Sequence, residues 1–319
     1  MGVRLSQTLP CGAASRVLLL ALGMGSIGPL ALAQGIPSAQ AHPPAASAQL
    51  APGPDPGEVA IRSNTLIAAS VGGALAYGYA KWWQDGLSGE FKTVREGWFG
   101  RNTDYGGADK LGHGMFAYAG SRLLAHALRE AGNDPATALR LDLATAVGTL
   151  MGVEVIDGFS ARWRFSREDA VANVAGGALA YLMETHPRLD ALLDLRLQYL
   201  PSNGPGRGKR FDPFSDYSGQ RYLAVFKASG VPAWREHPVL RYLEFNIGYG
   251  ARNFEPESRA LARPTRHVYV GIALNLSEAL GQTVFRGQPA ATPARQLTDT
   301  ALEFLQVPAA TWQHDHVLR

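Results

Sequence analysis

The chain has 319 residues, of which 46% are hydrophobic and 18% are charged, and its formal charge is +3. This length fits one or two domains with a sizeable buried core. A single cysteine excludes an internal disulfide framework and a cysteine-based zinc cluster. The small net charge, without a basic stripe between stacking aromatic residues, gives no indication of nucleic-acid binding. A mean hydropathy of −0.08 argues against a chain made mostly of membrane spans.

Residues 1–33 have the pattern of a secretory signal peptide. A positively charged flank precedes an apolar run, and Ala31-Leu32-Ala33 forms a small-x-small cleavage site. An uncleaved membrane anchor is the alternative. Cleavage near Ala33 predicts a periplasmic or outer-membrane-associated protein, and the loss of two arginines lowers the formal charge from +3 to +1. The only cysteine, Cys11, lies before the apolar run, so the sequence does not predict a lipidated cysteine after it.

Residues 34–60 are rich in Pro and Ala and predict a disordered linker. Apolar periodicity and capping residues then predict a compact helical domain over residues 61–195. Asp134 and Ser166 are the expected N-caps of its last two helices. The domain is expected to be a bundle of about four helices, at Ser63–Trp83, Ala108–Ala131, Pro135–Ile156 and Arg167–Glu184.

The first expected helix is the best candidate for contact with a membrane. Its run from Thr65 to Ala80 carries no charge but is short for a bilayer core. The later helices contain charged residues that are costly in lipid. We therefore expect the bundle to lie outside the bilayer and to touch a membrane surface or an envelope lipid, while insertion of Ser63–Trp83 stays open.

The C-terminal half is expected to be less helical. Residues 196–238 predict a connector, with a short amphipathic helix at Tyr222–Ala228. Residues 281–319 predict a C-terminal tail that contains a short helix near Ala294–Leu305 and an exposed end with His314 and His316.

Between these segments, residues 239–280 predict an antiparallel β-hairpin. Apolar and polar residues alternate over Leu240–Phe254 and over Arg266–Leu276. The expected fold is therefore mainly α, with a C-terminal β-hairpin region (α+β). Two strands alone are marginal in water, so the hairpin must pack on the helices, lie against a membrane or pair with a protein partner through its edge.

One hexapeptide occurs twice. Gly72-Gly73-Ala74-Leu75-Ala76-Tyr77 returns as Gly176-Gly177-Ala178-Leu179-Ala180-Tyr181. Because the surrounding residues differ, we interpret the repeat as small-residue packing between helices, with duplication of a whole unit as the weaker alternative.

Polar residues fall on common faces of three expected helices. Asp109 and His113 are four residues apart, Glu154 and Asp157 are three apart, and Asp169, Asn173 and Gly176 follow one stripe. If these faces converge, four carboxylates and one imidazole share a small volume and require compensation. We expect Lys110 to point away from Asp109, because consecutive helical residues do not face each other. Compensation is expected from shared protons, from a divalent cation such as Mg²⁺, Mn²⁺, Ca²⁺ or Zn²⁺, or from the basic residues Lys110, Arg162, Arg164 and Arg167.

Three interpretations of this cluster stay open: a structural network that fixes helix register, a non-catalytic ligand or metal site, and an enzyme site. An enzyme would be a hydrolase or transferase acting on envelope phospholipid or a lipid-linked glycan, with His113 as general base or metal ligand. Its other catalytic residues would be Asp109, Glu154, Asp157 and Asp169, and its ligand-binding residues Lys110, Arg164, Arg167 and Asn173. The candidate metal ligands are Asp109, His113, Glu154 and Asp157.

The order of these motifs resembles a known family. Asp109-Lys110-x-x-His113, Glu154-x-x-Asp157 and Ser166-x-x-Asp169-x-x-x-Asn173-x-x-Gly176, preceded by Glu96-Gly97-Trp98-Phe99, look like the signature of YfiM-like predicted periplasmic lipoproteins. The resemblance covers about residues 80–185. It implies export to the envelope and a small helical domain, without an established activity. The Asp-Lys-x-x-His motif is more distantly similar to VanZ-like membrane proteins, linked to glycopeptide resistance, which implies cell-wall or lipid chemistry.

Overall fold

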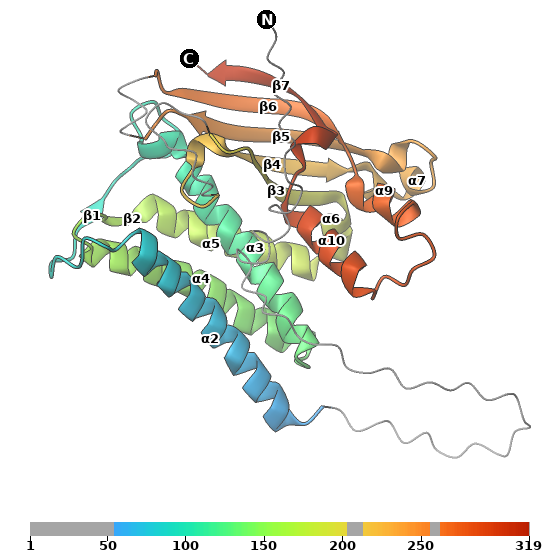
Figure 1. Cartoon of the computed structure of the whole chain (residues 1–319), viewed down its shortest axis with the longest axis horizontal. Helices are drawn as coiled ribbons and strands as arrows, with labels where there is room; N and C mark the ends of the chain where they lie inside the picture. Colours follow the sequence, from blue (N-terminus) through green and yellow to red (C-terminus); the bar gives the residue numbers. More distant parts are fainter. Residues whose placement is uncertain (1–53, 203–212, 256–261, 319) are drawn as a thin grey trace, which may run out of the picture.

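The computed structural model describes residues 54–202, 213–255 and 262–318, so the expected signal peptide and most of the expected linker lie outside the described residues. The fold is α+β, with a layer of helices followed by a five-stranded antiparallel sheet (Figure 1). The first part contains α2 (Pro56–Lys81), β1 (Thr93–Val94), η1 (Asp104–Gly107), α3 (Ala108–Glu130), α4 (Pro135–Phe159), β2 (Phe165–Ser166), α5 (Arg167–Thr185) and α6 (Pro187–Leu192). The second part contains β3 (Leu193–Tyr199), η2 (Tyr217–Gly219), β4 (Gln220–Lys227), η3 (Ala228–Gly230), α7 (Pro232–Arg235), η4 (Leu240–Tyr242), β5 (Leu243–Arg252), β6 (Thr265–Leu274), α9 (Leu276–Gln282), α10 (Pro293–Phe304), η5 (Pro308–Ala310) and β7 (Thr311–Leu318).

The four expected helices are present as α2, α3, α4 and α5. The side chain of Asp134 accepts hydrogen bonds from two backbone N–H groups at the start of α4, and Ser166 accepts one at the start of α5. Helix α2 starts earlier than expected, because Asp55 caps it and Pro56 occupies its first position. The end of the expected linker over residues 34–60 is therefore helical, and that boundary was wrong.

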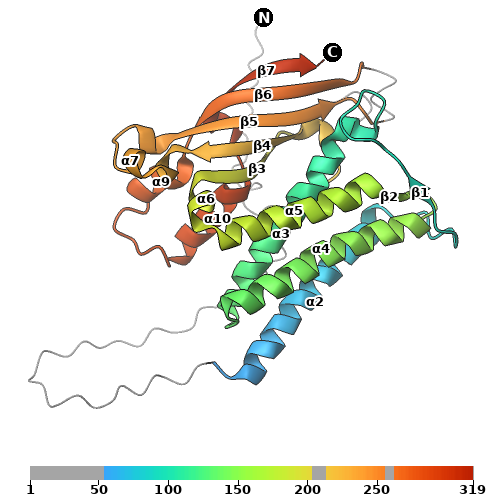
Figure 2. The ribbon, with the colours of Figure 1, turned by 180° about the vertical axis from the view of Figure 1, so that it is seen from behind.

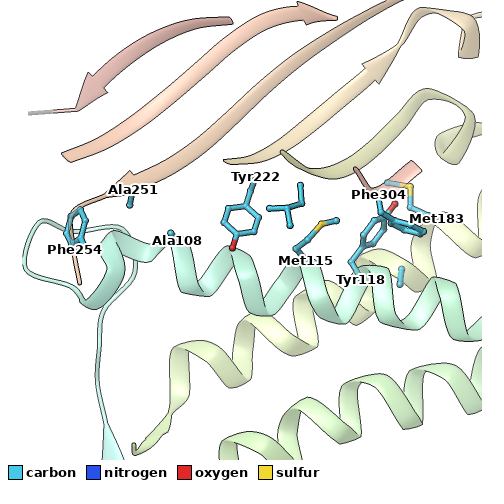
Figure 3. Packing of buried hydrophobic residues seen from close by; sticks show 10 residues of the cluster. Ala108, Met115, Tyr118, Met183, Tyr222, Ala251, Phe254 and Phe304 are labelled. Atoms are coloured by element: carbon cyan, nitrogen blue, oxygen red, sulfur yellow. The ribbon is translucent and has the colours of Figure 1, made fainter. Parts of the chain in front are cut away.

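Helix α3 lies between the sheet on one side and α4 and α5 on the other (Figures 1 and 2). Its buried residues Met115 and Tyr118 pack in one hydrophobic cluster with Tyr222 of β4, Met183 of α5 and Phe304 of α10 (Figure 3). A self-contained four-helix bundle is thus not confirmed. The helices complete their core only against the sheet and α10.

The strand order of the sheet is β3-β4-β5-β6-β7, and every neighbouring pair is antiparallel. Strands β5 and β6 confirm the expected hairpin, with Leu243 opposite Leu274 and Arg252 opposite Thr265. The expectation of two strands was incomplete, since β3, β4 and β7 extend the sheet on both sides.

Three strands replace expected irregular or helical segments. The segment Tyr222–Ala228, expected as a short helix, lies in strand β4 up to Lys227, because periodicity alone does not separate a short buried strand from a short helix. Strand β3 carries Asp194 and Arg196 into the interior, where Arg196 also pairs with Glu244. The predicted exposed end with His314 and His316 forms most of β7, whereas the expected helix near Ala294–Leu305 is confirmed as α10.

The two copies of the repeated hexapeptide have different environments. A Cβ atom on Gly176 would clash with the carbonyl oxygen of Gly114 and lie 2.9 Å from the Cβ of Ala117, so this copy sets the close approach of α5 to α3. A Cβ atom on Gly72 in α2 would meet no atom within 4 Å. The packing interpretation therefore holds for the second copy only.

Replacing each glycine by alanine tests this difference. Gly176→Ala should lower the free energy of unfolding by about 2–3 kcal/mol through overpacking of α3 against α5. Gly72→Ala should raise it by about 0.5–1 kcal/mol, because alanine loses less backbone entropy in an open helical position. Chemical denaturation of both variants measures the two changes, and equal effects would contradict the assigned packing.

Candidate functional site

A left-handed turn sets the start of α3. Tyr105, Gly106 and Gly107 have φ values of 50°, 62° and 85°. A Cβ atom on Gly107 would collide with the carbonyl oxygen of Trp98, so only glycine lets the preceding loop pass this close. The turn brings Glu96 from that loop beside Lys110 in the first turn of α3.

Lys110 is the centre of a buried charge cluster. Its Nζ lies 2.6 Å from Asp109 Oδ2 and 3.0 Å from Asp169 Oδ1, and it also donates to Glu96. The side chain of Lys110 is only 1% exposed. The expectation that Lys110 points away from Asp109 was therefore wrong, because a long, flexible side chain can curl back toward its neighbour.

His113 lies one turn further along α3, beside residues of α4 and α5. Its Nδ1 donates to Asn173 Oδ1 at 3.1 Å and lies 3.6 Å from Glu154 Oε1. Its Nε2 lies 3.9 Å from Asp169 Oδ2. Glu154 also accepts a hydrogen bond from the backbone N–H of Ser166 at 3.2 Å, which fixes the start of α5 against the end of α4.

The structure thus brings six of the expected site residues into one cluster, made of Asp109, Lys110, His113, Glu154, Asp169 and Asn173. We call it, together with Glu96, the Lys110 cluster. Asp157 stands apart, since its Oδ1 accepts from Trp83 Nε1 at 2.6 Å. Arg164 and Arg167 are exposed, and no ion pair joins them to the cluster within the described part of the chain. Sequence reasoning gave Glu96 no role, although the motif that contains it was visible.

Most side chains of the cluster are buried, and Glu96 and His113 are partly exposed. Their exposed fractions range from 1% for Lys110 and 2% for Glu154 to 20% for His113. On the sheet side, the hydroxyl of Tyr222 packs so close to Gly112 that a Cβ atom there would lie 2.9 Å from it. The ring of Tyr217 packs at a tilt against Tyr105, with centroids 4.6 Å apart. The sheet therefore covers the polar face of α3.

Burial controls the protonation of this cluster. It raises the pKa of Glu154 to about 9 and that of Asp109 to about 7, and the nearby Asp169 carboxylate adds to both shifts. Burial lowers the pKa of His113, which favours the neutral imidazole. Burial alone would lower the pKa of Lys110 as well, but the surrounding carboxylates outweigh it and raise that pKa. The negative charge of the acids is therefore compensated by the ammonium group of Lys110 and by protons that the carboxyls retain.

Two triplets of side chains have the spacing that a metal ion would require. The ligand atoms of His113, Glu154 and Asp169 lie within 4.8 Å of one another, as do those of Glu96, Asp109 and Asp169. In the second triplet, Lys110 already contacts all three carboxylates, so a positive charge is present. The first triplet, with one imidazole and two carboxylates, fits the chemistry of a divalent cation better.

Comparison with known proteins finds one family model that is similar to part of the chain. Residues 95–185 match the family described as "Predicted periplasmic lipoprotein (DUF2279)". The matched range contains every residue of the Lys110 cluster and ends with α5, so the five-stranded sheet lies outside it. No curated protein and no solved structure matches the chain. The family's description agrees with the expected localisation in the periplasm or at the outer membrane.

The pKa of Glu154 predicts how stability depends on pH. A carboxyl whose pKa is raised in the folded state binds more protons in the native state than in the unfolded state. Its contribution to the free energy of unfolding is therefore complete below pH 4.5 and is lost as pH rises toward about 9. Glu154→Gln keeps the acceptor oxygen and removes this titration. We expect the variant to gain stability relative to the wild type across that window, measured by thermal unfolding at several pH values.

Repeating the unfolding measurements in the presence of a chelator provides the control. If protons and Lys110 balance the acids, EDTA should leave both stability curves unchanged. A wild-type curve that drops on chelation, or a variant that loses stability relative to the wild type as pH rises, would contradict this assignment of charge.

Proposed function

We propose that this protein is an exported, non-catalytic component of the cell envelope, held at a membrane through α2. The family description supports export and membrane association, and the match over residues 95–185 supports a YfiM-like helical domain. The observation that carries the membrane part of the proposal is the surface of α2. This helix has 26 residues, of which only Ser63 and Gly78 are buried.

Helix α2 has the dimensions and composition of a membrane-contacting segment. Within the described residues it is the one helix long and apolar enough to cross a bilayer, with 6% of its most apolar window buried. At 1.5 Å per residue it is about 39 Å long, compared with about 30 Å for a hydrocarbon core. Ile61 and Tyr79 are 69% and 73% exposed. Lys81 and Trp82 at its C-terminal end are residue types that are common at membrane interfaces.

The attachment of α2 to the rest of the protein is concentrated at its two ends. Near its start, Asn133 Nδ2 donates to Ser63 Oγ at 2.7 Å. Just after its end, Trp163 Nε1 donates to the carbonyl oxygen of Trp82 at 2.8 Å. Between them the helix presents Gly72, Gly73 and Leu75 outward. An apolar helix that is hydrogen-bonded at both ends and exposes one side of its middle suits a lipid contact.

The closed state of the Lys110 cluster supports a structural role. An enzyme acting on phospholipid or lipid-linked glycan requires its acids and base to reach the substrate. Here Lys110, Asp109 and Asp169 are paired and 1–8% exposed, His113 is 20% exposed, and the exposed Arg164 and Arg167 lie outside the cluster. Buried ionic contacts of this kind fix the register of packed elements. The VanZ-type chemistry gains no support from this geometry.

A divalent cation at His113, Glu154 and Asp169 is the second candidate for the cluster. It is favoured by the convergence of the three ligand atoms within 4.8 Å. In that case chelation would destabilise the wild type and leave the stability of Glu154→Gln unchanged. This result would distinguish a cation site from a structural network.

Membrane binding tests the proposed function directly. Leu75→Glu places a charge in the uncovered middle of α2, where Leu75 is 36% exposed, so folding should be retained. Because a charge in lipid costs about 2.5–3.5 kcal/mol even by the lower scales, we expect the variant to bind membranes at least tenfold more weakly. Flotation with vesicles of phosphatidylethanolamine and phosphatidylglycerol measures the change.

Leu297→Glu provides the matched control, since Leu297 lies on α10 and is 47% exposed. This variant should float like the wild type. Equal flotation of Leu75→Glu and the wild type, or absence of wild-type flotation, would contradict membrane attachment through α2.

A further inference from the structure

Strand β7 forms an open edge of the five-stranded sheet. It is the last strand in the order β3-β4-β5-β6-β7 and pairs with β6 along Thr311–Leu318. Figures 1 and 2 show no described element on its outer side. A row of backbone N–H and C=O groups on such an edge is a template for pairing with another strand.

The opposite edge, formed by β3, is partly covered. The backbone N–H of Gln306 donates to the carbonyl oxygen of Leu197 in β3 at 3.0 Å, and Leu305 forms a parallel bridge with the same residue. The side chain of Gln306 also accepts from Arg196 at 3.1 Å. Because the β3 edge is covered at Leu197, whereas no described element lies beside β7, we expect edge pairing at β7, where a twofold pair is closed and does not grow into a fibre.

Strand β7 lacks the usual protection of an edge strand. In natural proteins, Lys or Pro residues, β-bulges or a short length prevent an edge strand from pairing with another chain. The segment Thr311–Leu318 has eight residues, without Lys, Arg or Pro, and its single acid, Asp315, is held by His267 at 2.7 Å. Trp312 is 65% exposed and lies opposite Ile272 at the border of an apolar sheet face. That face continues over β5 and β6 through the exposed residues Phe245, Ile247, Val270 and Ile272.

We propose that the β7 edge pairs antiparallel with the β7 edge of a second copy of this chain, joining two sheets into one. In a continuous sheet related by a twofold axis, residues of the same face lie opposite one another. With His314 on the axis, Trp312 faces His316 of the second copy, and Gln313 faces Asp315 of the second copy. With Asp315 on the axis, two carboxylates would oppose each other, which is unfavourable. The register centred on His314 avoids this repulsion, and it is the register that we propose.

A disulfide experiment tests this register in the full-length chain, with Cys11→Ser as background. Directly opposite residues of antiparallel strands have Cα atoms about 4.5–5.5 Å apart, which fits a disulfide. We expect His314→Cys to form a covalent dimer on mild oxidation. His316→Cys is the matched control, because its two copies would be roughly 13 Å apart, four residues along the strand. It should stay monomeric on a non-reducing gel.

Mass measurement of the unmodified chain completes the test. The detergent-solubilised protein should show a doubling of the 34.1 kDa chain mass, or of its processed form. His314→Lys should halve that mass, because two ammonium groups meet on the axis, while His126→Lys on the exposed side of α3 should leave it unchanged. A wild-type monomer, equal crosslinking of His314→Cys and His316→Cys, a dimeric His314→Lys variant, or a complex with a different protein would overturn the proposal. None of these outcomes depends on membrane attachment through α2.

Discussion

The burial of one ammonium group among three carboxylates is the interaction on which the helical part depends. Lys110 contributes a charge that is 1% exposed, and Glu96, Asp109 and Asp169 each contact it. These acids come from the loop before α3, from α3 and from α5. The same contacts therefore tie α3 to the loop before it and to α5, which is distant in sequence. Removing the lysine would leave several buried acids without a cation, which costs far more than the loss of a surface ion pair.

The rest of the site follows from this constraint. Glu154 has no cation of its own, so burial raises its pKa, and a retained proton lets it stay beside the neutral His113. Ser166 connects the two ends of the arrangement: its N–H donates to Glu154, and its hydroxyl caps α5 at Asp169. The small residues Gly112 and Gly176 then allow the sheet and α5 to approach α3 closely. Both the compensated charges and the close packing are thus located along helix α3.

The helical part of the fold was predictable because its signals are local. Asp134 and Ser166 cap their helices as expected, and the hairpin alternation gave β5 and β6. Strand β3 was not predictable, since Asp194 and Arg196 look solvent-exposed until Glu244, distant in sequence, is brought beside them. The helical positions of Asp109 and Lys110 also led to the wrong expectation that their side chains point apart. Helix geometry determines the direction of a Cβ atom, but not the position of the end of a long side chain. Spacing placed Asp109, His113, Glu154 and Asp169 on polar helix faces but left open whether these faces converge. Asp157, on the same face as Glu154, instead accepts a hydrogen bond from Trp83.

The most direct test of the central role of Lys110 is a double-mutant cycle with Asp169, measured as the free energy of unfolding. Lys110→Met and Asp169→Asn should each destabilise the protein, and Lys110→Met by about 3–5 kcal/mol, because a buried charge loses its partner. The double variant should lose much less than the sum of the two single losses, with a coupling of about 1–3 kcal/mol. Strictly additive losses would show that the two residues act independently and would contradict the account given for this cluster.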